Sequence, residues 1–180
     1  CRMDVFTYST FTATMALVAL ALAIVALVAR FVTTAETRAG LASPARWFAW
    51  LVAATCMAGS LIYSEYYHFQ PCVLCWYQRI AMYPLAAVLL VGAIRKDGRI
   101  RTYGLPLSVI GLCISIYHVL IQNFPQLDAG GACDPAVPCT AKYVNMFGFV
   151  SIPFMALAGF LLITVLLATF SGATVPEKDA

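Results

Sequence analysis

The sequence predicts an all-α, polytopic membrane protein. Of its 180 residues, 62% are hydrophobic and only 11% are charged, whereas a soluble domain carries about 25% charged residues. Five stretches are apolar over about the 20 residues that a helix needs to cross the hydrocarbon core. Basic residues gather in alternate connecting segments, as they do in multi-span proteins. The net charge of +3 comes without a basic block, which argues against nucleic acid as a partner.

Each span is expected to be helical, because a bilayer offers no water to satisfy exposed backbone groups. The first span is interpreted as a retained additional N-terminal transmembrane helix, not a cleaved signal peptide. Three arginines follow it, and they would hold its downstream end inside the cell. The predicted spans are residues 11–29, 47–64, 77–94, 105–121 and 149–170.

Charge asymmetry predicts the orientation of the chain. Arginines follow the first span, and a basic cluster from Arg95 to Arg101 follows the third. The positive-inside rule therefore places residues 30–46, residues 95–104 and the C-terminus in the cytoplasm. Segments 65–76 and 122–148 then face outward. The chain divides into an N-terminal helix and cytoplasmic loop (1–46), a core (47–170) and a cytoplasmic tail (171–180).

Four of the seven cysteines form two short-range pairs. Cys72 and Cys75 are separated by two residues, and Cys133 and Cys139 by five. Both pairs lie on the predicted outer side, where disulfides persist. The remaining three are given no redox role: Cys56 and Cys113 are interpreted as small buried apolar residues within spans, and Cys1 as a processing boundary in preference to a lipid-modified residue.

The first pair lies where the third span begins. Unpaired N–H groups at a helix N-terminus favour a thiolate, so Cys75 is expected to be activated there. Arg79 lies on the same helical face and would stabilise this thiolate or contact the carbonyl oxygen of a bound ring. The alternatives are a structural disulfide or a zinc site for the cysteines, and snorkelling toward the headgroups for Arg79.

The second pair lies in an outer loop of 27 residues, 122–148. Loops of this length without regular structure are often functional. Gly130 and Gly131 precede the pair and give it reach, while Pro135 and Pro138 restrict the ring that a disulfide would close. The alternative is a disulfide that only staples the loop.

Two histidines complete the candidate residues. His118 lies near the outer end of the fourth span, and an ionisable residue at membrane depth is a functional candidate. It could donate a hydrogen bond to a quinone oxygen or relay a proton, or it could simply bond to a neighbouring helix. His68, in the outer loop before Cys72, is expected at the surface.

These motifs resemble those of a known family. The run Cys72-Val73-Leu74-Cys75-Trp76-Tyr77-Gln78-Arg79 resembles the quinone-side motif of the bacterial disulfide-bond-forming membrane oxidoreductases of the DsbB type. His118 with Gln122 and Pro125 is similar to the histidine segment of that family. The stretch from Val137 to Phe154 resembles its Gram-positive branch, often called BdbC. The resemblance covers about residues 47–170.

The resemblance implies a four-helix bundle around a quinone, either ubiquinone or menaquinone, in the bacterial cell membrane. It implies that Cys72 and Cys75 deliver electrons to the quinone, with Cys75 nearest the ring and Arg79 and His118 beside it. Cys133 and Cys139 would oxidise a thioredoxin-like partner on the extracytoplasmic side, and Cys133 would be the point of attack. The expected activity is that of a protein-disulfide:quinone oxidoreductase.

Two features depart from the family pattern. The loop cysteines are only six positions apart, and the first span has no counterpart, so it is expected to be a peripheral helix. Two other functions remain open, a vitamin K epoxide reductase-like enzyme and a non-catalytic subunit whose disulfides brace loops. The quinone hypothesis requires a ring-sized cleft beside Cys75 and two cysteine pairs within reach of each other.

Overall fold

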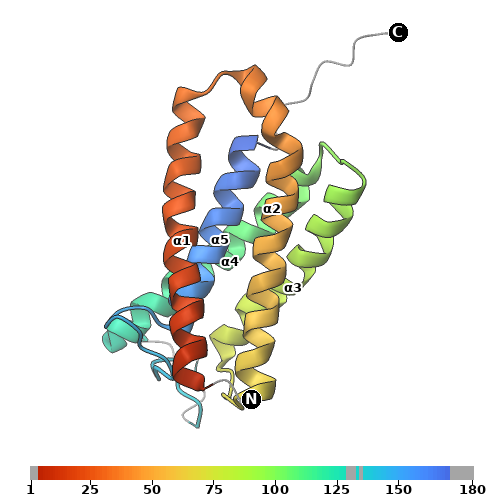
Figure 1. The fold of residues 1–180 in the computed structure, drawn as a ribbon. Helices are drawn as coiled ribbons and strands as arrows, with labels where there is room; N and C mark the ends of the chain where they lie inside the picture. Colours follow the sequence, from red (N-terminus) through yellow and green to blue (C-terminus); the bar gives the residue numbers. More distant parts are fainter. Residues whose placement is uncertain (1–3, 129–132, 134–135, 171–180) are drawn as a thin grey trace.

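The computed structural model describes residues 4–128, 133 and 136–170. Cys1, the glycines before the second cysteine pair, Pro135 and the tail 171–180 lie outside these residues. Five helices are each long and apolar enough to cross a membrane, which confirms the predicted class. They are α1 (Val5–Val32), α2 (Ala35–Leu61), α3 (Val73–Ile94), α4 (Ile100–Asn123) and α5 (Ile152–Phe170) (Figure 1).

Helices α2 to α5 form the predicted four-helix bundle. Going round it, α2 packs on α3, α3 on α4, α4 on α5, and α5 on α2. The additional helix α1 packs against α5, so that α5 is seen between α1 and α2 in Figure 1. Helix α5 therefore contacts all four other helices, α4, α1 and α2 more extensively than α3, and it is the most enclosed of the five spans.

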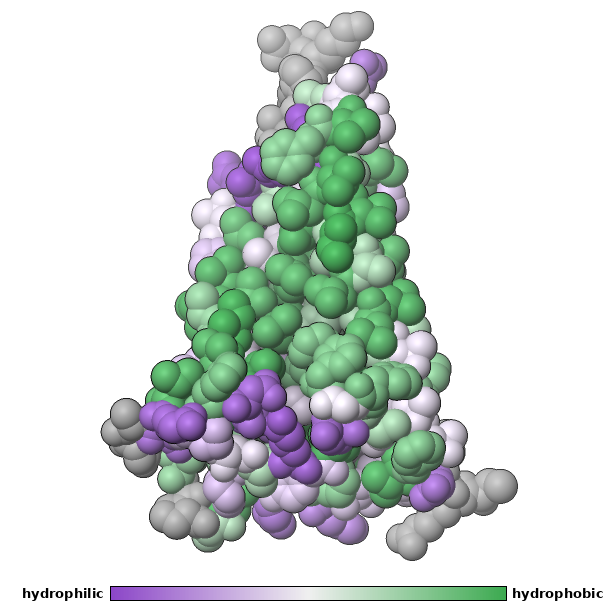
Figure 2. Space-filling model, turned by 90° about the vertical axis from the view of Figure 1, so that its left-hand side faces the viewer, coloured by the Kyte–Doolittle hydropathy of each residue, from purple (hydrophilic) through white to green (hydrophobic). Residues whose placement is uncertain are grey.

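The connections at the two ends of the bundle differ in character. The short α1–α2 and α3–α4 connections lie at one end, and the segments that carry the cysteine pairs lie at the other (Figure 1). The side of the molecule formed by α1 is apolar along its length, with hydrophilic residues toward both ends (Figure 2). This distribution suits a protein that spans a bilayer.

The predicted loop of residues 30–46 is wrong in extent, because almost all of it is helical. Helix α1 continues to Val32, and α2 already begins at Ala35. Thr34 caps α2, its hydroxyl accepting a hydrogen bond from the Thr37 N–H at 3.4 Å. Arg38 donates to the Arg30 carbonyl at 2.7 Å, at the end of α1. The predicted second span begins only at residue 47, because the residues before it are charged or polar. Alanine, glutamate and arginine are nevertheless good helix formers, so α2 begins well before the apolar stretch.

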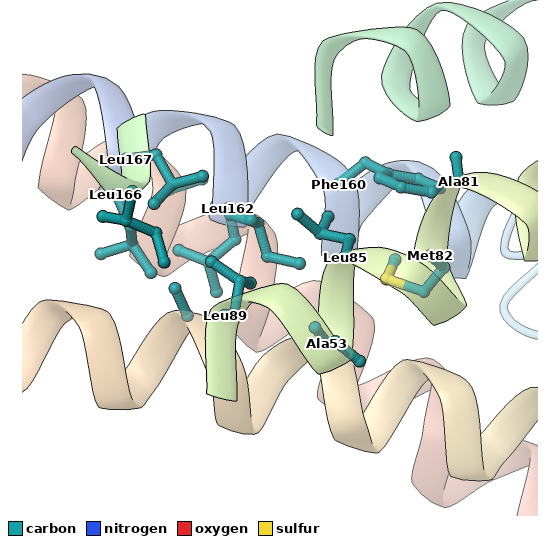
Figure 3. Packing of buried hydrophobic residues seen from close by; sticks show 14 of the residues in the cluster. Ala53, Ala81, Met82, Leu85, Leu89, Phe160, Leu162, Leu166 and Leu167 are labelled. Carbon is teal, nitrogen blue, oxygen red and sulfur yellow. The ribbon is translucent and has the colours of Figure 1, made fainter. Parts of the chain in front are cut away.

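The bundle core lies mainly between α3 and α5. Leu85 and Leu89 of α3 are fully buried, as are Phe160 and Leu167 of α5, and Figure 3 shows these side chains packed together with Ala53 of α2. Small residues let the helices approach closely, as is usual between membrane helices. Gly111 of α4, for instance, lies directly against the ring of Phe160.

We expect Gly111→Ala to destabilise the bundle by about 1–3 kcal/mol, the usual cost of overpacking a core. A Cβ atom at this position would overlap the Phe160 ring, and the ring is fully buried. Thermal unfolding in detergent measures the effect. The control is Gly40→Ala, where an added Cβ meets nothing within 4 Å. That variant should be no less stable than the parent, since alanine is the better helix former. Equal melting temperatures for the two variants would contradict this packing.

Candidate redox site at the end of the bundle

The first cysteine pair is built on the start of α3. Cys72 follows Pro71 and is the N-cap residue of the helix, with an extended backbone (φ −71°, ψ 171°). Its sulfur accepts a hydrogen bond from the Cys75 N–H at 3.4 Å. Both cysteines are free thiols, and their sulfur atoms are 2.7 Å apart. The pair is therefore poised to form a disulfide with only a small side-chain rotation.

At the start of α3 the hydrogen bonds reach the sulfur of Cys72, three residues before the cysteine that the sequence predicts to be activated. The hydrogen bond from the Cys75 thiol lowers the pKa of Cys72 to about 4, although burial acts in the opposite direction. His118 lowers the pKa further. The helix N-terminus adds the smallest contribution in the same direction: it bonds an orphan N–H group to the cap residue, and here the Cys75 N–H is bonded to the cap, Cys72.

His118 connects the two cysteine pairs. It projects from α4 and is 1% exposed. Its Nε2 atom lies 3.7 Å from Cys72 Sγ and 3.1 Å from the Cys139 carbonyl oxygen. On the other side of the ring, the Gln78 side-chain nitrogen lies 3.4 Å from Nδ1. An amide nitrogen only donates, so Nδ1 accepts, and Nε2 carries the proton that it donates toward Cys139.

The second pair forms a disulfide, Cys133–Cys139, with the Cα atoms 5.8 Å apart. Cys139 is 1% exposed, and Cys133 is half-buried. Gln122 anchors the loop by donating to the Ala141 carbonyl at 3.1 Å. Both pairs belong to one apolar cluster, in which Cys72 and Cys139 are packed with Leu74 and Ile121 of α3 and α4, and Cys75 and Cys133 lie at its edge. The loop thus holds the two pairs together at one end of the bundle.

Arg79 is held by the end of α2. Its Nε atom donates to the Ser60 hydroxyl at 2.9 Å, and Nη2 donates to the Ser60 carbonyl at 3.1 Å. The guanidinium also lies 5.2 Å from the centre of the Trp76 ring. A π-helical turn, Ile62–Tyr66, ends α2 next to this contact. Arg79 is therefore held by protein groups next to Cys75, and its side chain does not extend freely toward the lipid headgroups.

A cavity of about 600 Å³ opens beside the first cysteine pair. This volume is in the range of small-molecule sites, which are mostly apolar with a few polar groups. Cys75, Arg79, His118 and Gln122 all line it. The cleft that the quinone hypothesis requires is present, and it receives the side chains that the sequence analysis selected around Cys75.

The sulfur spacing is closer to that of a disulfide than to that of a metal site. Cys72, Cys75 and His118 have ligand atoms within 4.8 Å of one another. Two sulfurs bound to a tetrahedral zinc at 2.3 Å each would be about 3.8 Å apart, whereas these are 2.7 Å apart. The close approach suits the exchange of a sulfur–sulfur bond.

Sequence reasoning missed two contributors to the site and misplaced one single cysteine. Gln78 is buried and bonds to His118; a glutamine inside an apolar span was the signal that could have found it. Helix α1, expected to be peripheral, also lines the cavity, for example through Thr12. Cys113 is exposed, not buried, and Cys56 packs against Gly159 of α5. His68 is exposed, as predicted.

A helical bundle of membrane-spanning length that holds two adjacent cysteine pairs at one end defines a membrane thiol–disulfide oxidoreductase. Residues 43–170 match the family model described as disulfide bond formation protein DsbB. The chain belongs to this family. Membership favours a disulfide-forming oxidoreductase over the vitamin K epoxide reductase-like alternative and over a non-catalytic subunit.

Similar proteins come from Gram-positive bacteria, in agreement with the resemblance to the BdbC branch. The chain is 51% identical over 117 residues to "Probable disulfide formation protein C 1" of Bacillus anthracis, covering 65% of this chain and 84% of that protein. It is 46% identical over 123 residues to "Disulfide bond formation protein C" of Bacillus subtilis (strain 168), covering 68% and 89%. No solved structure matches the chain significantly. Helix α1 precedes the region that matches the family.

Proposed function

We propose that the protein is a thiol:quinone oxidoreductase, which reoxidises a thioredoxin-like partner outside the cytoplasm and passes the electrons to ubiquinone or menaquinone. The observation that carries the proposal is that the two cysteine pairs share one cluster and that the first of them, Cys72 and Cys75, lines the cavity. In the structure the second pair is a disulfide and the first a dithiol.

The electron route is a series of thiol–disulfide exchanges. A thiolate of the partner attacks Cys133, the more exposed sulfur of the loop disulfide, and Cys139 leaves. The second thiol of the partner then releases the oxidised partner, and Cys133 and Cys139 are left reduced. One of these two sulfurs next attacks the Cys72–Cys75 disulfide, and the second closes the loop disulfide again, which leaves Cys72 and Cys75 as a dithiol.

His118 favours one direction for the internal exchange, because it lowers the pKa of Cys72 and does not itself take part in the exchange. The thiol with the lower pKa is the better leaving group, so the incoming sulfur would attack Cys75 and Cys72 would leave as a thiolate beside His118. His118 lies 3.7 Å from Cys72 Sγ and can stabilise the negative charge through its Nε2 proton.

The residues around the cavity fit a quinone. A quinone bound beside Cys75 accepts two electrons and two protons. Arg79 is a donor for a ring oxygen, and His118 becomes one when its Nε2 proton turns away from the Cys139 carbonyl. Gln122 Oε1 is buried without a hydrogen-bond partner among the described residues, so it can accept from a hydroxyl. The remaining cavity wall is largely apolar, which suits a hydrocarbon tail.

A trapped mixed disulfide tests the proposal. We expect Cys139→Ser to accumulate a covalent adduct with a thioredoxin-like protein through Cys133. The lone Cys133 thiolate attacks the disulfide of the oxidised partner and displaces one of its thiolates, and no Cys139 remains to resolve the adduct. Mass spectrometry of the adduct, purified without reductant, identifies the protein. The matched control is Cys133→Ser, which leaves only Cys139, 1% exposed, and should trap little. Equal trapping by the two variants would contradict Cys133 as the point of attack.

Labelling of intact cells tests the proposed orientation. After reduction, a membrane-impermeant maleimide should label Cys133 without lysis, because the loop faces outward. A cysteine introduced by Thr34→Cys, in the exposed α1–α2 connection, should be labelled only after lysis. The reverse pattern would overturn the orientation, and it would also remove the oxidising compartment that the proposal needs.

A further inference from the structure

The cavity extends well beyond the space needed for a ring beside Cys75. It continues as a slot between α1 and α2, with α5 as its floor. Its residues on α2 run from Phe48 to Ser60, a distance of about 18 Å at 1.5 Å per residue. The polar groups are concentrated at the cysteine end, and the rest of the slot is lined almost entirely by hydrocarbon.

Helix α1 forms one wall of this slot with a single face. Thr12, Met15, Ala19 and Leu22 all line the cavity, and their spacing of three to four residues places them on the same side of a helix. The alanine in the middle of this wall leaves room between α1 and α2. At the cysteine end the two helices touch: Thr12 Oγ1 lies 2.7 Å from the Tyr63 hydroxyl.

We propose that α1 is a binding element, which encloses the polyprenyl tail of the quinone in the slot between α1, α2 and α5. The inference rests on the proposed function, since it takes the ring to lie beside Cys75. Three properties of the slot fit a polyprenyl chain: it is elongated, it is apolar, and it is continuous with the site of the ring. Because α1 precedes the region shared with the family, this wall is a feature of this chain that the family match does not supply.

Photo-crosslinking of the full-length protein tests the wall directly. The probe is a polyprenyl quinone with a diazirine at the far end of its tail, and mass spectrometry locates the adducts. We expect adducts on the faces of α1 and α2 that line the slot. Ala19→Phe fills the slot and should lower this labelling by at least about tenfold. The matched control is Ala21→Phe, which lies on the exposed side of the same helix and should label like the parent.

Kinetics with two quinones separate this inference from the proposed function. Ala19→Phe should raise the KM for a prenylated quinone by at least about tenfold, and much less for the same ring without a tail. Thr55→Phe blocks the α2 side of the slot and takes the place of Ala19→Phe if that variant does not fold.

Each outcome bears on one of the two claims. If the parent protein reduces neither quinone with thiols, the proposed function fails. If the parent reduces both quinones and the blocking variants change the KM for both by the same factor, the proposed function stands and the role of α1 is wrong. A phospholipid with a diazirine in its acyl chain would also overturn this role if it labelled the slot and prenylated quinone did not displace it.

Discussion

Cys75→Ala should lower thiol-dependent quinone reduction by at least about 1000-fold, because removal of one member of a catalytic unit costs nearly as much as removal of the whole unit. Two electrons leave a dithiol only if both sulfurs are present to form the disulfide, and Cys72 Sγ has no other sulfur as near as the 2.7 Å of Cys75 among the described contacts. The measurement is absorbance of a soluble quinone, with the purified protein and dithiothreitol as the electron source.

The control for this prediction is Cys113→Ala. Cys113 is an exposed cysteine on α4, outside the cluster of the two pairs, and its removal should leave the rate unchanged. If Cys75→Ala reduced quinone at a rate within about tenfold of the parent, this sulfur would not account for most of the lowering of the activation free energy. The electron route through the first pair would then be wrong.

Titration of the Cys72 thiolate should show a midpoint near pH 4, several units below the ordinary thiol value of about 8.5. Because the pKa is lowered, the thiolate persists at neutral pH and is protonated only as the pH falls through about 4. The ultraviolet absorbance of the thiolate reports this change. The experiment uses reduced protein with Cys133 and Cys139 replaced by serine, and a matched sample that also carries Cys72→Ser supplies the background.

Two further variants test the causes of this lowered pKa. Cys75→Ala removes the hydrogen bond that lowers it most, so the midpoint should rise by several pH units. His118→Phe removes a smaller contribution and should raise the midpoint less. A parent midpoint near the ordinary thiol value, or a larger rise with His118→Phe than with Cys75→Ala, would contradict the arrangement at the start of α3.

The class of fold followed from the sequence because apolar length and basic loops are local signals. Length and composition identify each span without any knowledge of its neighbours. The start of α2 at Ala35 could not be found in the same way, since the residues that precede Trp47 are helical but not apolar. A hydropathy argument locates the membrane-embedded part of a helix, and helix propensity and capping decide where the helix actually begins.

The candidate site was predictable in its residue types and less so in its contacts. Cys72, Cys75, Arg79 and His118 stood out as cysteines in a tight pair or as charged groups at membrane depth. That His118 bonds to the Cys139 carbonyl depends on how the outer loop folds back over α4, which no local pattern contains. Which cysteine sulfur accepts the N–H hydrogen bond of the helix depends on where the N-cap lies. Here the N-cap is Cys72, three residues before Cys75.

The two-residue connection between α1 and α2 limits how these helices can separate. Only Thr33 and Thr34 lie between them, so at that end the helices are tied as an antiparallel pair. At the far end they are joined by side chains alone, through the Thr12–Tyr63 hydroxyl contact and the packing of Tyr8 on Tyr63, with ring centres 5.1 Å apart. If α1 and α2 separate, they therefore separate most at this far end. The lateral opening to the bilayer would then be widest at the depth of the sulfur atoms.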